Sequence, residues 1–183
     1  ATTRAGDRVT APLMLSPREV ADCLRGAVAA LRAELGALPA PVLAFHPAPG
    51  EWCAKEVVGH LIEAERRGFA GRIRIILAGD APALEAWDAD AIARARRDCE
   101  RDWTALVDEL ARLREESAAL VAALGVADLA RAGRHPTVGL LRVGDLLHEW
   151  VHHDRNHLRQ ILANVQAYVW PAMGNAQRFS RPG

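Results

Sequence analysis

The sequence contains no apolar run close to the roughly 20 residues that a membrane-spanning helix needs, and residues 1–15 lack the charged-then-apolar layout of a secretory signal. An excess of charge of one sign is missing too, because 23 Lys and Arg residues face 23 Asp and Glu residues. A chain of zero formal charge lacks the long-range positive field that attracts phosphate backbones. We therefore expect a cytoplasmic protein that enters no membrane and binds no nucleic acid.

Cysteine and lysine are also scarce. Cys23, Cys53 and Cys99 are odd in number and far apart, with no CxxC pair, which argues against a disulfide framework. Lys55 is the only lysine, and the arginines that supply the other positive charges are scattered along the chain. We interpret the cysteines as buried free thiols and the arginines as a compositional bias.

The chain of 183 residues is long enough to form one domain with a substantial core. Residues 1–15 show no sustained period and are expected to form an N-terminal arm. Ser16 can then cap a helix that begins with Pro17, with Glu19 reaching back as in a capping box. Apolar residues recur at three- and four-residue steps until residues 38–50, where four prolines predict a loop.

Three further helices are predicted over about residues 53–77, 88–124 and 143–169. The second of these would be the longest element, because no proline or glycine interrupts it. No segment alternates polar and apolar residues as a half-buried strand does for more than a few positions. Four amphipathic helices indicate an all-α fold, an antiparallel four-helix bundle over residues 16–170, followed by a loosely held tail at 171–183. Either direct hairpins or a crossover could make its longer connections.

The seven histidines are unevenly distributed, and four of them fall in the last predicted helix. On a period of 3.6 residues, His153 and His157 lie on the apolar stripe of that helix, one turn apart. Both imidazoles can therefore meet a single cation. His148 and His152 fall off this stripe and are expected at the rim or in solvent.

A third ligand is required, because two imidazoles alone would bind a metal weakly. His60, in the second predicted helix, lies on an inward face with Val57 and Ala64. Metal sites in bundle cores are commonly assembled from facing helices, and three imidazoles leave coordination positions for water and substrate. On spacing alone, the alternative is a set of core histidines whose ring nitrogens find ordinary hydrogen bonds.

Three segments of the sequence resemble the DinB/YfiT-like superfamily. Residues 46–61, HPAPGEWCAKEVVGHL, are similar to the pattern P-x-x-G-x-W-S-x-x-E-x-x-x-H-L, with Cys53 in place of the usual hydroxyl residue. Residues 134–147 are similar to the lead-in H-P…G…T-x-x-D-L-L, with a valine where threonine often opens the helix. Residues 153–161 are similar to the ending H-D-x-x-H-x-x-Q-I.

This resemblance covers residues 45–165 and implies a DinB-like four-helix bundle in which one divalent metal ion binds to His60, His153 and His157. Zinc or nickel is expected first, with iron, manganese and cobalt as alternatives, because imidazole suits several of these metals. Family members include metal-dependent hydrolases and thiol S-transferases, so the implied activity is activation of water or of a thiol at the metal. The alternative is a non-catalytic, metal-stabilised bundle that acts as a stress-related binding or assembly module.

The implied partners are a small-molecule substrate, such as a low-molecular-weight thiol, and a second copy of the chain in a homodimer. Glu63 and Asp154 lie near predicted ligands and could each accept the second N–H of an imidazole, or be solvated carboxylates. Trp150, one turn before His153, could form a wall of the pocket or pack in the core, and Gln160 could lie inside or outside the pocket. No second metal site is predicted, because no further inward carboxylate–histidine pattern occurs.

Overall fold

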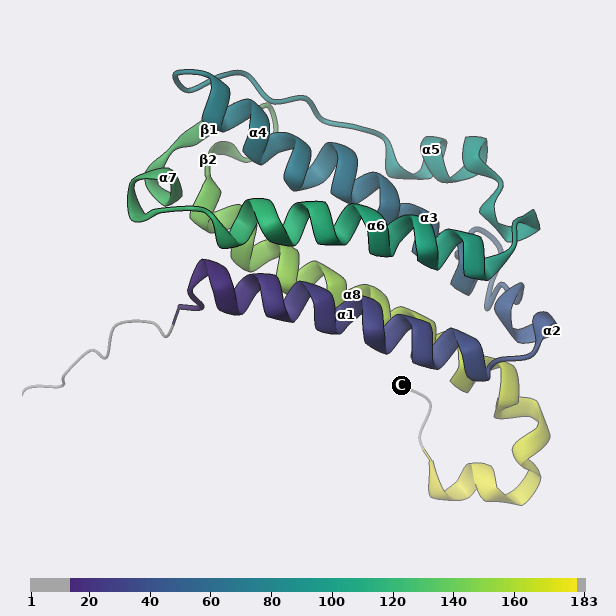
Figure 1. The fold of residues 1–183 in the computed structure, drawn as a ribbon. Helices are drawn as coiled ribbons and strands as arrows, with labels where there is room; N and C mark the ends of the chain where they lie inside the picture. Colours follow the sequence, from purple (N-terminus) through teal and green to yellow (C-terminus); the bar gives the residue numbers. More distant parts are fainter. Residues whose placement is uncertain (1–13, 181–183) are drawn as a thin grey trace, which may run out of the picture.

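The computed structural model describes residues 14–180, so most of the predicted N-terminal arm lies outside the described residues. The fold is a bundle of four helical rods (Figure 1), which confirms the predicted architecture. The first rod is α1, Pro17–Ala37. Its predicted start is confirmed, because Ser16 caps the helix and Glu19 completes a capping box. None of the helices in this part of the chain has the length and apolarity needed to cross a membrane.

The second rod follows the short α2, Ala40–Leu43, and runs as α3, Ala54–Glu63, a π-helical turn η1, Ala64–Gly68, and α4, Ala70–Ala78. A π turn adds one residue to a helical turn, so it rotates the side chains that follow relative to those that precede. Gly71 is required beside it, because a Cβ atom at that position would lie 1.9 Å from the Arg66 carbonyl oxygen.

The prediction of a single helix over residues 88–124 is wrong. The chain forms α5, Ala89–Arg96, then a 3-10 turn η2, Asp98–Glu100, and α6, Trp103–Ala122. Arg97 adopts a left-handed φ of 54° at the break. The cause is tertiary: the carboxylate of Asp98 packs directly against Gly59 of α3, where a Cβ atom would lie only 1.7 Å from an Asp98 oxygen.

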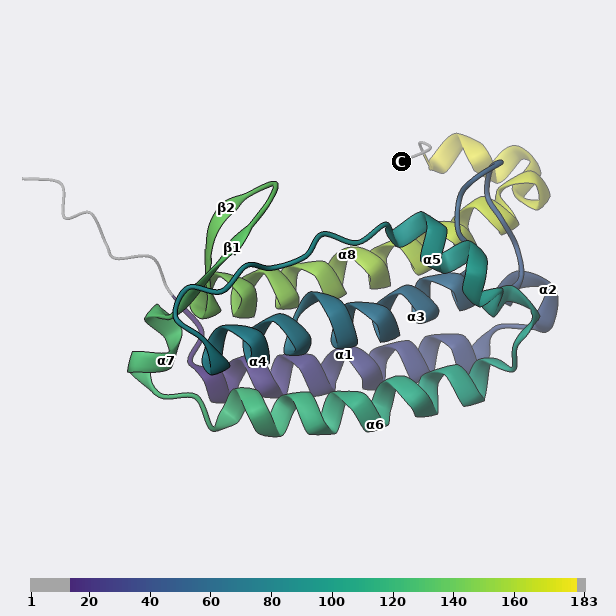
Figure 2. The same ribbon diagram turned by 90° about the horizontal axis from the view of Figure 1, so that it is seen from above.

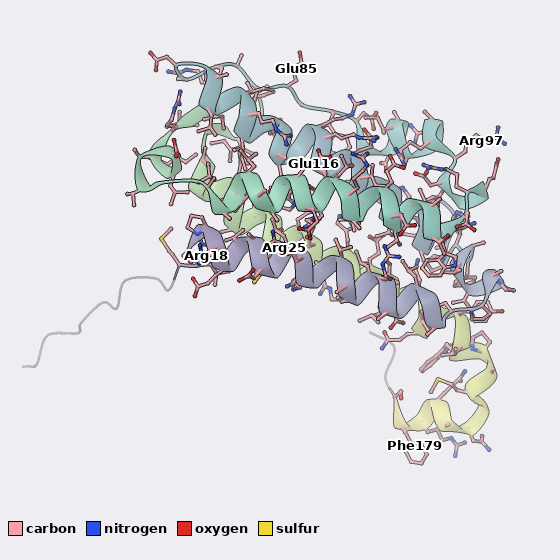
Figure 3. The ribbon with its side chains drawn as sticks, viewed as in Figure 1. Arg18, Arg25, Glu85, Arg97, Glu116 and Phe179 are labelled. Carbon is pink, nitrogen blue, oxygen red and sulfur yellow. The ribbon has the colours of Figure 1, made fainter. Side chains whose placement is uncertain are left out.

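The last rod is α8, Val143–Val169, which has the predicted bounds and is the longest helix in the described part of the chain. The short helix α7, Val126–Ala130, and an antiparallel hairpin of β1, Ala132–His135, and β2, Gly139–Arg142, precede it. The hairpin was not predicted, because strands of four residues are too short to show an alternating pattern. The tail begins with a 3-10 segment η3, Trp170–Phe179, and Phe179 projects away from the bundle (Figure 3).

The rods are ordered so that α1 packs between α6 and α8, and α3 packs on these same two helices from the opposite side. The second rod and α6 run in the same direction, so the expectation of a purely antiparallel bundle is wrong. Figures 1 and 2 show the connection between them returning along the whole bundle. Residues 79–88 make this crossover possible, because ten extended residues reach roughly 30 Å. We call this segment the strap.

The core consists of two apolar clusters separated by a polar layer. One cluster joins the first half of α1 to α4 and the first half of α8, and the other joins the second half of α1 to α3 and α6. Between them lie charged and imidazole side chains, several of them almost completely buried: His60, Glu63, Glu65, Arg114 and Asp154. The candidate site belongs to this layer.

Candidate metal centre

The structure brings together the three histidines that the sequence singled out. His60 comes from α3, and His153 and His157 lie one turn apart on α8. Each histidine has a ring nitrogen that lies within 4.8 Å of a ring nitrogen of both other histidines. The Nε2 atoms of His60 and His153 are 3.1 Å apart. Pairing of α3 with α8 thus places an imidazole from one helix opposite the His-x-x-x-His pair of the other.

The distance between the Nε2 atoms of His60 and His153 fits a shared divalent ion. With metal–nitrogen bonds of about 2.0–2.1 Å, two imidazole nitrogens on one ion lie roughly 2.9–3.4 Å apart, which brackets the 3.1 Å observed. Nδ1 of His60 and Nδ1 of His153 are buried without a hydrogen-bond partner, so no hydrogen bond at Nδ1 orients either ring. His157 Nδ1 lies 2.9 Å from Gln160 Oε1, which leaves Nε2 of that ring as a ligand atom. The three side chains therefore form a suitable donor set for one metal ion.

Two of the three imidazoles, those of His60 and His157, are held in the neutral form that metal binding requires. Burial lowers the pKa of His60 to about 3, and the neighbouring His157 and His153 add to this effect. Burial also lowers the pKa of His157, followed by the effect of His153. At neutral pH these two rings thus offer lone pairs rather than a positive charge.

Two tryptophans and a phenylalanine surround the histidines. The ring of Trp52 lies 4.8 Å from that of His60, and Trp87, in the strap, stacks on His60 at 5.6 Å. Phe69 contacts the edge of His153 at 5.1 Å. Trp150 is the suggested wall residue, but it is completely buried behind Phe69, on which it stacks at 4.9 Å. It therefore packs in the core, behind the phenylalanine that contacts His153.

The carboxylates predicted near the ligands behave differently from one another. Asp154 lies 3.8 Å from Nδ1 of His153, a charge contact too long for a hydrogen bond. Glu63 turns its oxygens to the guanidinium groups of Arg66, Arg67 and Arg96, at 2.7–3.1 Å. Because His60 Nδ1 has no partner, Glu63 does not orient that imidazole. Gln160 is the side chain that holds a ligand ring by a hydrogen bond.

A buried ionic cluster of Arg114, Glu65 and Asp154 adjoins the histidines and was not predicted. All three side chains are at least 98% buried, and Arg114 contacts both carboxylates, that of Glu65 at 2.7 Å. Burial alone would raise the pKa of Asp154, but the charge of Arg114 keeps it below the ordinary value. The sequence pattern could have indicated this cluster, because Arg114 lies four residues from Leu110 and from Ala118 on the apolar face of α6. An arginine at a core position predicts a buried anion.

The remaining histidines of α8 lie where the sequence indicated. His148 is half-buried, and its Nδ1 lies 2.8 Å from the Gly144 carbonyl oxygen. The side chain of His152 is 69% exposed. Neither belongs to the group of three donors.

Comparison with known proteins agrees with the fold. A family model described as the DinB superfamily matches residues 23–161. Among solved structures, the chain is similar to YfiT from Bacillus subtilis, which is described as a probable metal-dependent hydrolase with an unusual four-helix bundle topology. The two share 19% identity and a TM-score of 0.76, over 90% of this chain and 92% of that chain. No significant match was found among curated proteins.

Proposed function

Because the chain belongs to the DinB superfamily, we propose that it is a metal-dependent hydrolase in which His60, His153 and His157 hold one divalent ion. The observation that supports this proposal is the convergence of three imidazole donors from two helices on one point. When bound, such an ion lowers the pKa of a coordinated water or thiol towards neutrality and polarises the group to be cleaved.

Access to the centre favours a catalytic role over a purely structural one. His60 is buried, whereas the side chain of His153 is 19% exposed, so solvent reaches the cluster at His153. Three protein ligands would leave a divalent ion with open coordination positions. Trp52 and Trp87 cover His60 and limit the water around it, which strengthens electrostatic interactions at the centre.

The same donor set would also activate a low-molecular-weight thiol, which makes thiol S-transfer the second reaction to test. Neutral imidazole ligands are compatible with zinc and nickel, and with iron, manganese and cobalt. A cytoplasmic location and a homodimer remain predictions from the sequence. Sedimentation at micromolar concentration would test the homodimer, and a purely monomeric species would contradict it.

The ligand assignment is tested by metal stoichiometry in single variants. Replacing His60, His153 or His157 by alanine should reduce bound zinc well below one equivalent per chain at this centre, because two imidazoles bind weakly. His152→Ala is the matched control on the same helix and should bind as much zinc as the unaltered chain. Full occupancy in the His60→Ala protein would refute the centre.

Catalysis is tested separately with the cobalt-substituted protein. Small thiols and carboxylates should change its visible spectrum if open positions are accessible, and the loaded protein should hydrolyse activated esters or amides faster than His157→Ala. If the spectrum responds only to thiols and a thiol acceptor is consumed, S-transfer replaces hydrolysis. If neither ligands nor substrates have an effect, the ion is a structural link between α3 and α8.

A further inference from the structure

Four side chains with metal-binding atoms converge at a second place, at the end of the bundle where α3 begins. They are His46, in the loop after α2, Cys53 and Glu56 at the start of α3, and Cys99 in η2. One donor atom of each lies within 4.8 Å of one donor atom of every other. Figures 1 and 2 show α2, the start of α3 and the segment after α5 gathered at this end, which Arg97 marks in Figure 3.

We propose that His46, Cys53, Glu56 and Cys99 form a structural zinc site, separate from the three-histidine centre. Two cysteines, a histidine and a carboxylate are a donor set that zinc takes in its closed, four-coordinate sites. The inference does not depend on the proposed function, because none of these residues belongs to the three-histidine centre. Cys53 precedes His60 by seven residues, so the two sites lie about 10 Å apart along the helix axis.

The contacts within the group show that the donors already face one another. The Sγ atoms of Cys53 and Cys99 are 2.8 Å apart, and His46 Nε2 lies 2.8 Å from Glu56 Oε2. The backbone N–H of Cys53 donates to the same Glu56 oxygen at 2.8 Å, which fixes the carboxylate over the helix start. A disulfide would use only the two sulfur atoms, whereas one ion accounts for the convergence of all four side chains.

The local electrostatics suit anionic ligands. Cys53 caps α3, and Glu56 lies in its first turn, where the free N–H groups of a helix stabilise negative charge. Cys53 is completely buried, and a buried thiolate needs a cation beside it. A bound zinc ion supplies that charge and deprotonates a coordinating thiol. With zinc–sulfur bonds of about 2.3 Å, the two sulfur atoms would move apart by about 1 Å.

The proposed ion would fasten the covering segment to the bundle. Cys99 follows Asp98, the residue that packs on Gly59, and this part of the chain continues from the strap that places Trp87 on His60. One zinc ion would therefore join the α2–α3 loop, the start of α3 and the η2 turn. Its role is to hold these three segments together, since four protein ligands leave no position for substrate.

The experiment measures metal binding to the full chain kept reduced with a phosphine. The unaltered protein should bind two equivalents of zinc or cobalt, and cobalt should produce the intense near-ultraviolet absorption of a thiolate–cobalt bond. The double variant C53S/C99S should bind one equivalent and lose this absorption. His60→Ala should lose the equivalent bound at the three-histidine centre and keep the thiolate–cobalt absorption. Cys23→Ser, which alters the third thiol, is the matched control and should behave as the unaltered chain.

Two further measurements separate the zinc site from simpler explanations. His46→Ala leaves both sulfur atoms in place, so weaker binding of the thiolate-ligated ion in this variant supports the four-ligand site, and unchanged binding overturns it. Absence of the thiolate absorption in the unaltered protein, or a Cys53–Cys99 disulfide detected by mass in the reduced, metal-treated sample, also overturns it. Helix content by circular dichroism and the equivalent retained at the three-histidine centre show that C53S/C99S is folded.

Discussion

The polar layer of the bundle holds two groups of three side chains that differ in whether the group contains both positive and negative charges. In the ionic cluster, Arg114 lies between the carboxylates of Glu65 and Asp154, and opposite charges meet inside the chain. In the histidine cluster, three imidazoles face one another, and none carries a compensating charge. His153 and Asp154 are consecutive residues of α8, so one helix contributes to both groups.

The difference indicates what each group is for. A buried charge is tolerated only when it is paired, so the ionic cluster is a closed arrangement that fixes the positions of η1, α6 and α8. The histidine cluster has no opposite charge of its own, and its ring nitrogens are donors of the kind that bind divalent ions. This composition supports the proposed role of the cluster as a site for an ion from outside, and the ionic cluster links the helices beside it.

The largest effect is expected when the ionic cluster is broken. Arg114→Met would leave two buried carboxylates without a cation, and removing one partner of such a group costs roughly 3–5 kcal/mol of unfolding free energy. Chemical denaturation of the metal-free protein measures this loss. Arg112→Met is the matched control on the same helix, because the Arg112 side chain is 62% exposed and pairs only with Glu116. Its effect should stay within about 0.5 kcal/mol, and equal effects in the two variants would contradict the closed arrangement.

A smaller effect is expected from the titration of His60 in the metal-free protein. The unfolded chain binds a proton there near pH 6.5, whereas the folded chain does so only near pH 3. Between these values the unfolded state binds more protons, so acidification favours unfolding, by about 2 kcal/mol from pH 7 to pH 5. His60→Gln removes this contribution.

The titration of Glu65 changes the unfolding free energy in the opposite direction over the same pH range. Burial raises its pKa to about 7, so the folded state binds this proton more tightly and becomes less stable as the pH rises. The test is therefore the difference in unfolding free energy between the unaltered chain and His60→Gln, in both of which Glu65 titrates. That difference should shift by about 2 kcal/mol between pH 7 and pH 5. No shift would show that His60 is not held neutral by the fold.

The smallest effect is expected at the edge of the histidine cluster. Gln160→Leu removes the hydrogen bond to His157 Nδ1 and keeps the volume of the side chain nearly constant. Loss of a group that orients a ligand typically weakens metal binding about tenfold or more, which competition with a chelator would measure. Gln166→Leu, at an exposed position of α8, should leave the affinity unchanged. If both variants bind metal equally well, Gln160 does not orient the ligand.

The elements that the sequence predicted well are those with local causes. Ser16 and Glu19 cap α1 through their own side chains, and His153 and His157 share a face because they are one turn apart. The inward face of its own helix suggested His60, and the resemblance then linked it to His153, which lies 93 residues away. Local pattern and family resemblance together were enough to name the three histidines.

The features that the sequence did not predict have causes far away in the chain. Residues 88–124 have a composition typical of one helix, and the break at Arg97 exists only because Asp98 packs on α3. Cys53 and Cys99 are 46 residues apart and resemble isolated thiols until the fold brings them together. The sequence left open whether Glu63 orients an imidazole or is solvated, and the structure shows that arginines from η1 and α5 bind its carboxylate.

The strap has a consequence that depends only on the order of the rods. Because the second rod and α6 run in the same direction, the chain must travel back along the bundle between them (Figure 2). Hydrogen bonds of 2.8 Å between the strap and Arg134 of the hairpin fix one part of this path, and Trp87 on His60 fixes another. The cover that Trp87 forms over His60 is thus a product of the connectivity and needs no inserted domain. A bundle joined entirely by short hairpins would have the same four rods but no segment to place this tryptophan on the histidine cluster.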